Sequence, residues 1–211
     1  MPVFKSGEGQ APSWCEMESF EIVHLSAGSA HTFERRGRKE KLIVASGVCT
    51  IRYGGRAVRG ERGTNLDIET VNDRFDVTDV IEGATLVRLC GRWGDEVGGS
   101  GLFFAVESEN PSDAGDPFSY PKRTAFDRHY HDCDEYWVIY EGCGTVVSEG
   151  KSYPVGPGDC VATGMGHHHD FPEVSSPIKA AFFETTLEGR KRTGHLWEHT
   201  HGLAEPRPER V

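Results

Sequence analysis

Short runs of β-branched and aromatic residues, separated every few positions by glycine or proline, dominate this sequence. Its 26 glycines and 11 prolines interrupt the chain too often for long helices. No long segment repeats apolar residues at helical spacing, so only a turn or two of helix is expected, around 192–198. The pattern predicts an all-β protein with many short strands and tight turns, a sandwich or a barrel. The expected strands are 42–45, 48–53, 76–81, 85–89, 102–106, 136–140, 145–148, 159–163 and 178–183.

The two halves of the chain repeat when the sequence is shifted by 95 positions. Shared glycines matter in such a comparison because tight turns need positive φ, which glycine accepts at little steric cost. The repeat predicts two similar β-barrels made by duplication: an N-terminal barrel over 1–106, a connecting segment over 107–124, and a C-terminal barrel with a short extension over 125–211. The coinciding pairs are Glu40 and Glu135, Gly47 and Gly142, Thr50 and Thr145, Gly55 and Gly150, Arg56 and Lys151, and Gly63 and Gly158.

Metal-ligating residue types gather in two stretches of the second half. Residues 128–142 read RHYHDCDEYWVIYEG, in which His129 and His131 stand two positions apart and so face the same side of a strand. Glu135 follows four positions later. Residues 153–171 read YPVGPGDCVATGMGHHHDF, and a glycine-rich bend there delivers three consecutive histidines. Neutral imidazoles with one carboxylate suit divalent transition metals and leave coordination positions open.

Both stretches resemble the motifs of the cupin family. The first cupin motif is HxH, three or four residues, E, six residues, G, and His129, His131, Glu135 and Gly142 fit it at every spacing. The second is PxG, two residues, H; residues 164–169 fit it with Gly164 in place of proline, which makes His169 the fourth ligand. The resemblance implies two tandem cupin barrels of the double-stranded β-helix, or jelly-roll, type. It also implies one divalent transition metal per chain, such as Fe, Mn, Zn or Ni.

Other histidines accompany the proposed ligands. In an extended segment His167 shares a face with His169 whereas His168 points away, and both are expected to line the barrel mouth or to lie in solvent. His195 and His199 would share one face of a helix and could hold a second metal. Such a cluster is more often a surface or interface feature, which is the interpretation favoured here.

The first half has lost the equivalent ligands. At the offset of 95, only Glu40 survives, while arginines stand at two of the three histidine positions; a guanidinium cannot donate a lone pair to a metal. His31 alone does not make a site. The N-terminal barrel is therefore expected to hold no metal and to be structural or an oligomer surface, with anion binding by its arginines as a weaker alternative. The replacing residues are Glu34, Arg36 and Arg74.

Three classes of function remain open for the predicted metal site. The favoured one is a metal-dependent isomerase, epimerase or lyase that uses the metal as a Lewis acid on a small sugar or a hydroxy or keto acid. The alternatives are an iron dioxygenase and a non-catalytic barrel that binds a metal or a small molecule. Trp137 and Ile139 share the strand face of Glu135 and should form the pocket floor, with Phe171 and Phe182 on its walls. The candidate acids and bases are Tyr130, Asp132, Asp134, His167 and Glu184.

The formal net charge of −10 argues against binding to nucleic acids or anionic membrane surfaces. The first residues, MPVFKSGEGQAPSW, lack the basic and apolar regions of a signal peptide. The six cysteines form no CxxC pair and are expected to be reduced thiols. We therefore expect a cytoplasmic protein that acts on a small-molecule substrate. The protein is expected to be a homodimer or a compact monomer.

Overall fold

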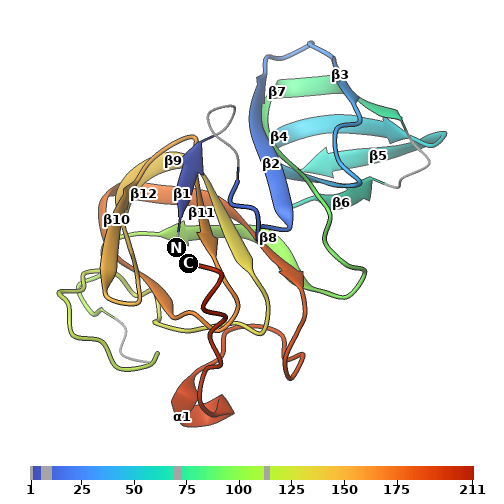
Figure 1. The fold of residues 1–211 in the computed structure, drawn as a ribbon. Helices are drawn as coiled ribbons and strands as arrows, with labels where there is room; N and C mark the ends of the chain where they lie inside the picture. Colours follow the sequence, from blue (N-terminus) through green and yellow to red (C-terminus); the bar gives the residue numbers. More distant parts are fainter. Residues whose placement is uncertain (1, 6–10, 69–72, 112–114) are drawn as a thin grey trace. The chain divides into compact units, whose positions relative to one another are not determined.

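The computed structural model describes residues 2–5, 11–68, 73–111 and 115–211. The chain forms two compact units, which we call the N-terminal unit (Met17–Trp93) and the C-terminal unit (Met1–Glu16 with Gly94–Val211). Each unit carries one six-stranded sheet in which all described strand pairs are antiparallel (Figure 1). The predicted all-β fold of jelly-roll type is confirmed.

The sheet of the N-terminal unit has the strand order β2-β7-β4-β5, with β3 paired to β7 and β6 paired to β4. Alternate residues of these strands point inward, and side chains such as Phe33, Leu42 and Phe75 form its core. Its strands are β2 (Met17–Leu25), β3 (His31–Glu34), β4 (Lys39–Tyr53), β5 (Arg56–Glu61), β6 (Asn65–Ile68) and β7 (Arg74–Gly91).

The sheet of the C-terminal unit has the strand order β1-β11-β9-β12-β8, with β10 paired to β9. Its core includes Trp137, Ile139 and Phe171. Its elements are β1 (Val3–Lys5), β8 (Val97–Ala105), β9 (Glu135–Ser148), β10 (Lys151–Val155), β11 (Asp159–Thr163), β12 (His169–Thr186) and the helix α1 (Glu198–His201).

In each unit, one glycine lies where the pairing between the two longest strands shifts register, β4 with β7 and β9 with β12. In β9 this residue is Gly142, with φ of 84°, and a side chain there would place its Cβ 2.0 Å from the carbonyl oxygen of Pro177. In β4 it is Gly47, with φ of 81°, and a Cβ would lie 1.9 Å from the carbonyl oxygen of Gly83. Both positions therefore require glycine for two reasons, backbone conformation and close backbone approach.

The offset of 95 positions also relates the strands. β7 begins at Arg74 and β12 at His169, 95 positions later, and both end 95 positions apart as well, at Gly91 and Thr186. The turn glycines match in conformation: Gly55 and Gly150 have φ of 75° and 74°, while Gly63 and Gly158 have φ of 91° and 89°. This agreement in strand bounds and backbone angles supports the duplication that the sequence predicts.

The division of the chain differs from the expected boundaries at 106 and 125. β8 lies outside the N-terminal unit because it pairs along β12, from Ala105 opposite Ile178 to Val97 opposite Thr186. β1 likewise pairs with β11. The described part of 107–124 does not link the two units but folds back on β12, where Lys122 forms a buried ion pair with Asp170.

The C-terminal helix begins later than predicted. Residues 192–197 are not helical, because Gly194 has φ of 83° and Leu196 forms a β-bridge with Tyr130; α1 starts only at Glu198. Across the described parts of the chain, no helix has the length and apolar character needed to cross a membrane.

Candidate metal centre

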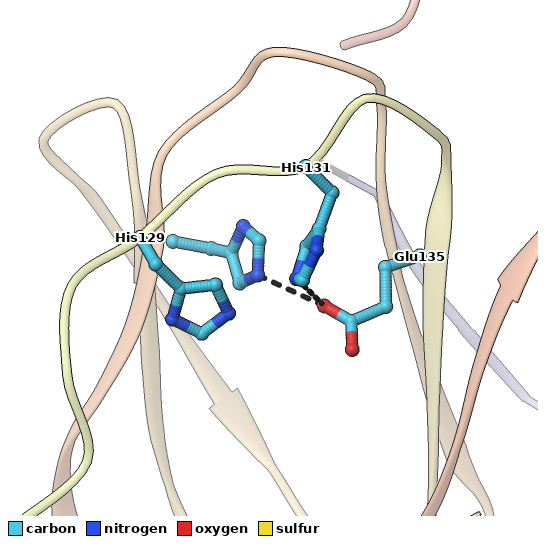
Figure 2. A group of neighbouring side chains, drawn as sticks. His129, His131 and Glu135 are labelled. Carbon is cyan, nitrogen blue, oxygen red and sulfur yellow. Dashed lines mark ion pairs between the residues drawn. The ribbon is translucent and has the colours of Figure 1, made fainter. Parts of the chain in front are cut away.

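The four predicted ligands meet at one end of the C-terminal sheet. Glu135 is the first residue of β9, and His169 is the first residue of β12. His129 forms an isolated bridge with His169 through reciprocal backbone hydrogen bonds of 3.2 and 3.0 Å. The alternation of side chains then places His129 and His131 on the same side, and Figure 2 shows both pointing with Glu135 toward a common centre.

The ligand atoms of these four residues all lie within 4.8 Å of one another. The Nε2 atoms of His169 and His131 are 2.9 and 3.3 Å from Oε2 of Glu135. All four residues are at most 4% exposed. Three imidazoles and one carboxylate thus converge in a space that solvent barely reaches.

Backbone carbonyl groups hold the three imidazole rings in one tautomer. Nδ1 of His129, His131 and His169 lies 2.9–3.0 Å from the carbonyl oxygens of Asp127, Gly194 and His167, respectively. Since a carbonyl oxygen only accepts hydrogen bonds, each Nδ1 carries the proton and each Nε2 presents a lone pair to the centre.

The inward atoms lack hydrogen-bond partners although they are buried. They are Nε2 of the three histidines and Oε2 of Glu135. Burial lowers the pKa of His129 to about 3, with the neighbouring His169 as the next cause, so this imidazole is neutral at physiological pH. Unpartnered buried polar atoms are costly, and this donor set is the one that divalent transition metals accept. The residues therefore fit the metal that the sequence predicts.

The expected pocket residues form a hydrophobic core beneath the ligands. The indole of Trp137 lies edge-on to His169, with ring centroids 5.2 Å apart, as expected for a floor. Ile139 and Phe171 are wholly buried in the same core cluster, and Phe182 packs against it partly buried. These side chains keep the floor of the site dry rather than line an open wall.

The structure separates three of the five candidate acids and bases. Glu184 lies beside the ligands, since it is in register with Glu135 across β12 and β9 and its Oε1 is 3.8 Å from Nδ1 of His131. Tyr130 instead donates its hydroxyl to the carbonyl oxygen of Gly202 at 2.6 Å. His167 places Nε2 2.8 Å from the carbonyl oxygen of Arg207. Tyr130 and His167 thus face the C-terminal segment.

Asp132 and Asp134 are likewise engaged by the C-terminal segment. Arg192 donates its backbone N–H and Nε to Asp132 at 2.9 and 3.1 Å. Arg210 donates Nη1 to Asp134 at 2.8 Å. Both carboxylates are therefore held by arginine residues of the C-terminal segment.

The remaining histidines do not form a second common site. His168, expected in solvent or at the barrel mouth, is only 7% exposed, and its Nε2 lies 2.9 Å from Asp116. His199 also pairs with Asp116, at 3.1 Å, whereas His195 pairs with Asp127 at 3.0 Å. His195 and His199 therefore belong to different clusters, because the segment between them is not helical.

Sequence reasoning missed Asp127 and Cys133 as neighbours of the ligands. Asp127 and His195 lie close enough to His129 to form a possible ligand group with it, and Cys133 does so with His131 and Glu184. Cys133 lies between the proposed ligands His131 and Glu135 in the sequence. Asp127, two positions before His129, carried no motif signal.

The equivalent position in the N-terminal unit holds an arginine instead of a ligand cluster. Glu40 accepts hydrogen bonds from Nη2 and Nε of Arg88, at 2.7 and 3.2 Å. Arg36 pairs with Glu21, and His31 is exposed on β3. Among the described residues, all three groups of side chains that could hold a metal lie in the C-terminal unit. The cation on Glu40 is therefore Arg88, and not Arg36 or Arg74, which stand at the ligand-equivalent positions.

Solved structures share this fold at low sequence identity. The protein YhaK from Escherichia coli matches with a TM-score of 0.56 and 11% identity, covering 88% of this chain and 93% of its own. Vicilin from hazelnut, Corylus avellana, matches with a TM-score of 0.55 and 11% identity, covering 87% of this chain and 79% of its own. No protein-family model matches the sequence.

The fold is that of cupin jelly-roll barrels, and the four residues of the cupin motifs converge within it. A relative from Sinorhizobium fredii, the "Uncharacterized protein y4oW", is 52% identical over 212 residues, covering 100% of this chain and 97% of its own. The chain belongs to the same cupin-fold family as y4oW.

Proposed function

We propose that the protein binds one divalent transition metal through His129, His131, Glu135 and His169. The observation that carries this proposal is the convergence of four buried, unpartnered ligand atoms within 4.8 Å. Backbone carbonyls that hold each Nδ1 preorganise the rings, so little ordering remains to be done on binding. A bound metal would satisfy all four atoms at once.

Elemental analysis of protein purified without a metal-affinity column tests this proposal. We expect about one first-row metal ion per chain, since one complete donor set is present. His131→Ala should remove the metal. The matched control is His168→Ala, which removes an imidazole next to a ligand in sequence but facing Asp116. Full occupancy in His131→Ala would contradict the assignment.

We further propose an enzyme of the isomerase, epimerase or lyase type that acts on a small sugar or a hydroxy or keto acid. When bound, the metal would act as a Lewis acid on a substrate oxygen. The chain would then need a group that moves a proton. Of the five candidates, Glu184 is the carboxylate left for this role, because Tyr130, Asp132, Asp134 and His167 are engaged by the C-terminal segment.

The surroundings of Glu184 support its role as the proton-transfer group. Its side chain is buried, and its Oε1 lies 3.8 Å from Nδ1 of the proposed ligand His131. Gly98 leaves room for the carboxylate, because a Cβ at that position would lie 2.6 Å from Oε2 of Glu184. A carboxylate within reach of a metal-bound small molecule is the arrangement that general acid–base catalysis requires.

A ligand panel tests the chemistry. Sugars, hydroxy acids and diketones that bind the metal-loaded protein should raise its melting temperature, because a ligand specific for the folded state stabilises it. Glu184→Gln should retain both metal and ligand binding but lose turnover. Oxygen consumption with any compound would favour the dioxygenase alternative. If a compound raises the melting temperature but is not converted with any first-row metal bound, the non-catalytic alternative would be favoured.

A further inference from the structure

The segment Arg192–Trp197, which we call the strap, runs along the stretch that carries two of the proposed ligands. Leu196 exchanges two backbone hydrogen bonds of 3.0 Å with Tyr130, the residue between His129 and His131. Arg192 anchors the start of the strap on Asp132. The strap therefore runs alongside the ligand stretch, although its residues lie 60 or more positions after those that they contact.

Two strap residues contact ligand histidines directly. The carbonyl oxygen of Gly194 accepts the Nδ1–H of His131 at 3.0 Å. The ring of His195 stacks on the ring of His129, with centroids 3.7 Å apart and an interplanar angle of 6°. Parallel contact over this distance restricts tilting of the His129 ring, whose Nε2 must point at the centre.

His195 is itself held in place by Asp127. Nδ1 of His195 lies 3.0 Å from Oδ1 of Asp127, and the indole Nε1 of Trp197 donates to Oδ2 of the same carboxylate at 2.8 Å. The backbone carbonyl of Asp127 also accepts the Nδ1–H of His129. Asp127 thus connects both stacked rings, one through its main chain and the other through its side chain.

Exposure distinguishes His195 from the ligands that it covers. The His129 side chain has no exposed surface, whereas the side chain of His195 is 43% exposed. His195 therefore covers one face of the His129 ring and is itself partly open to solvent.

We propose that His195 is a positioning residue of the metal centre, which holds the His129 ring and shields one face of it from solvent. This inference rests on the proposed metal site. Its consequence is kinetic: loss of the His195 ring should let a chelator take the metal faster, and should also distort the ligand geometry at His129.

Release of Co²⁺ from the loaded full-length chain into excess EDTA tests the proposal. His195→Ala should release the metal about 10-fold faster or more, since loss of a residue that orients a ligand typically costs 10–100-fold in metal affinity. His195→Phe, which keeps a stacking ring but loses the bond to Asp127, should show a smaller increase. His199→Ala is the matched control: its side chain is 51% exposed and pairs with Asp116 instead. It should stay within about twofold of the wild type.

The visible absorption spectrum of bound Co²⁺ provides a second readout, because it reports ligand geometry. It should change in His195→Ala and remain unchanged in His199→Ala. The metal-free variants should melt at the wild-type temperature, and Asp127→Asn should also accelerate release. Wild-type release and spectrum in His195→Ala would overturn the role of His195 alone. A wild-type chain that holds no cobalt would contradict the metal centre itself, and this inference with it.

Discussion

Glu40 in the N-terminal unit and Glu135 in the C-terminal unit stand at equivalent positions of the sequence repeat, yet their carboxylates have different partners. Glu135 faces His131 and His169 across a gap that a metal would fill. Glu40 forms a direct ion pair with the Arg88 guanidinium at 2.7 Å, and both side chains are at most 1% exposed. The same buried carboxylate can thus be compensated by a cation supplied by the chain or by one that the chain must bind.

Further contacts within the N-terminal unit hold Arg88 in place. Its guanidinium also pairs with Glu21 at 2.9 Å and lies over the rings of Phe33 and Phe75, 5.2 and 5.6 Å from their centroids. The residue 95 positions after Arg88 is Phe183, a buried apolar side chain. The N-terminal unit therefore differs from the C-terminal unit in two ways: it lacks the three histidines at the ligand positions, and it has an arginine where the C-terminal unit has Phe183.

The largest expected effect separates the two units by metal content. His169→Ala should weaken metal binding by more than about 100-fold, because changes outside the ligand set alone cost 10–100-fold. Arg74→Ala, at the equivalent position of the N-terminal unit, should leave metal binding unchanged. Isothermal titration of metal-free protein with Zn²⁺ or Co²⁺ measures both affinities. A loss of metal in Arg74→Ala would show that the N-terminal unit contributes to the site.

The second prediction tests the buried ion pair between Arg88 and Glu40. Arg88→Ala should destabilise the N-terminal unit by about 3–5 kcal/mol, since it leaves the Glu40 carboxylate buried without a cationic partner. Arg92→Ala removes a surface pair with Glu18, whose side chains are 45% and 46% exposed, and should cost less than about 1 kcal/mol. Urea unfolding curves give both free energies. Equal costs would mean that the Arg88 pair is no more important than a surface contact.

The third prediction concerns what the two units share. Gly47→Ala and Gly142→Ala should each cost more than about 3 kcal/mol, because the new Cβ would clash with a backbone carbonyl in addition to the strain of positive φ. Gly55→Ala and Gly150→Ala have the same sign of φ but open space around the Cβ, and should cost about 1–2 kcal/mol. Thermal unfolding of the four variants checks the order. A small loss of stability in Gly142→Ala with a large loss in Gly47→Ala would argue against the equivalence of these two glycine positions.

The smallest expected effect is a change in acid sensitivity. Burial alone would raise the pKa of Glu40, but hydrogen bonds from the backbone of Arg36 and Gly37 and from Arg88 lower it. The folded-state pKa of Glu40 therefore lies below the unfolded value of about 4.3. The ionised Glu40 carboxylate then stabilises the folded state at neutral pH, and this stabilisation is lost as the pH falls through the folded pKa. Glu40→Gln should therefore flatten the loss of stability below about pH 4. An unchanged pH profile in urea unfolding would contradict this assignment.

The sequence by itself determined the features that depend on local spacing. Glycines with positive φ, such as Gly142 and Gly158, mark turns and kinks because only the local backbone decides where a side chain is tolerated. The period of two along a strand places His129 and His131 on one side, and the glycine-rich bend delivers His169 to the same end of the sheet. The family motif then joined these pieces into one predicted cluster.

Only the tertiary structure decided which distant residues meet. Nothing near Glu40 in the sequence indicates Arg88 as its partner, and β8 joins the C-terminal sheet because β12 offers it a free edge, not because of its own composition. Likewise, Tyr130 and His167 looked equal to Glu184 as acids or bases until the C-terminal segment engaged them. The stacking of His195 on His129 joins positions far apart in the chain. Such contacts depend on the path of the whole chain, which the spacing within a motif does not encode.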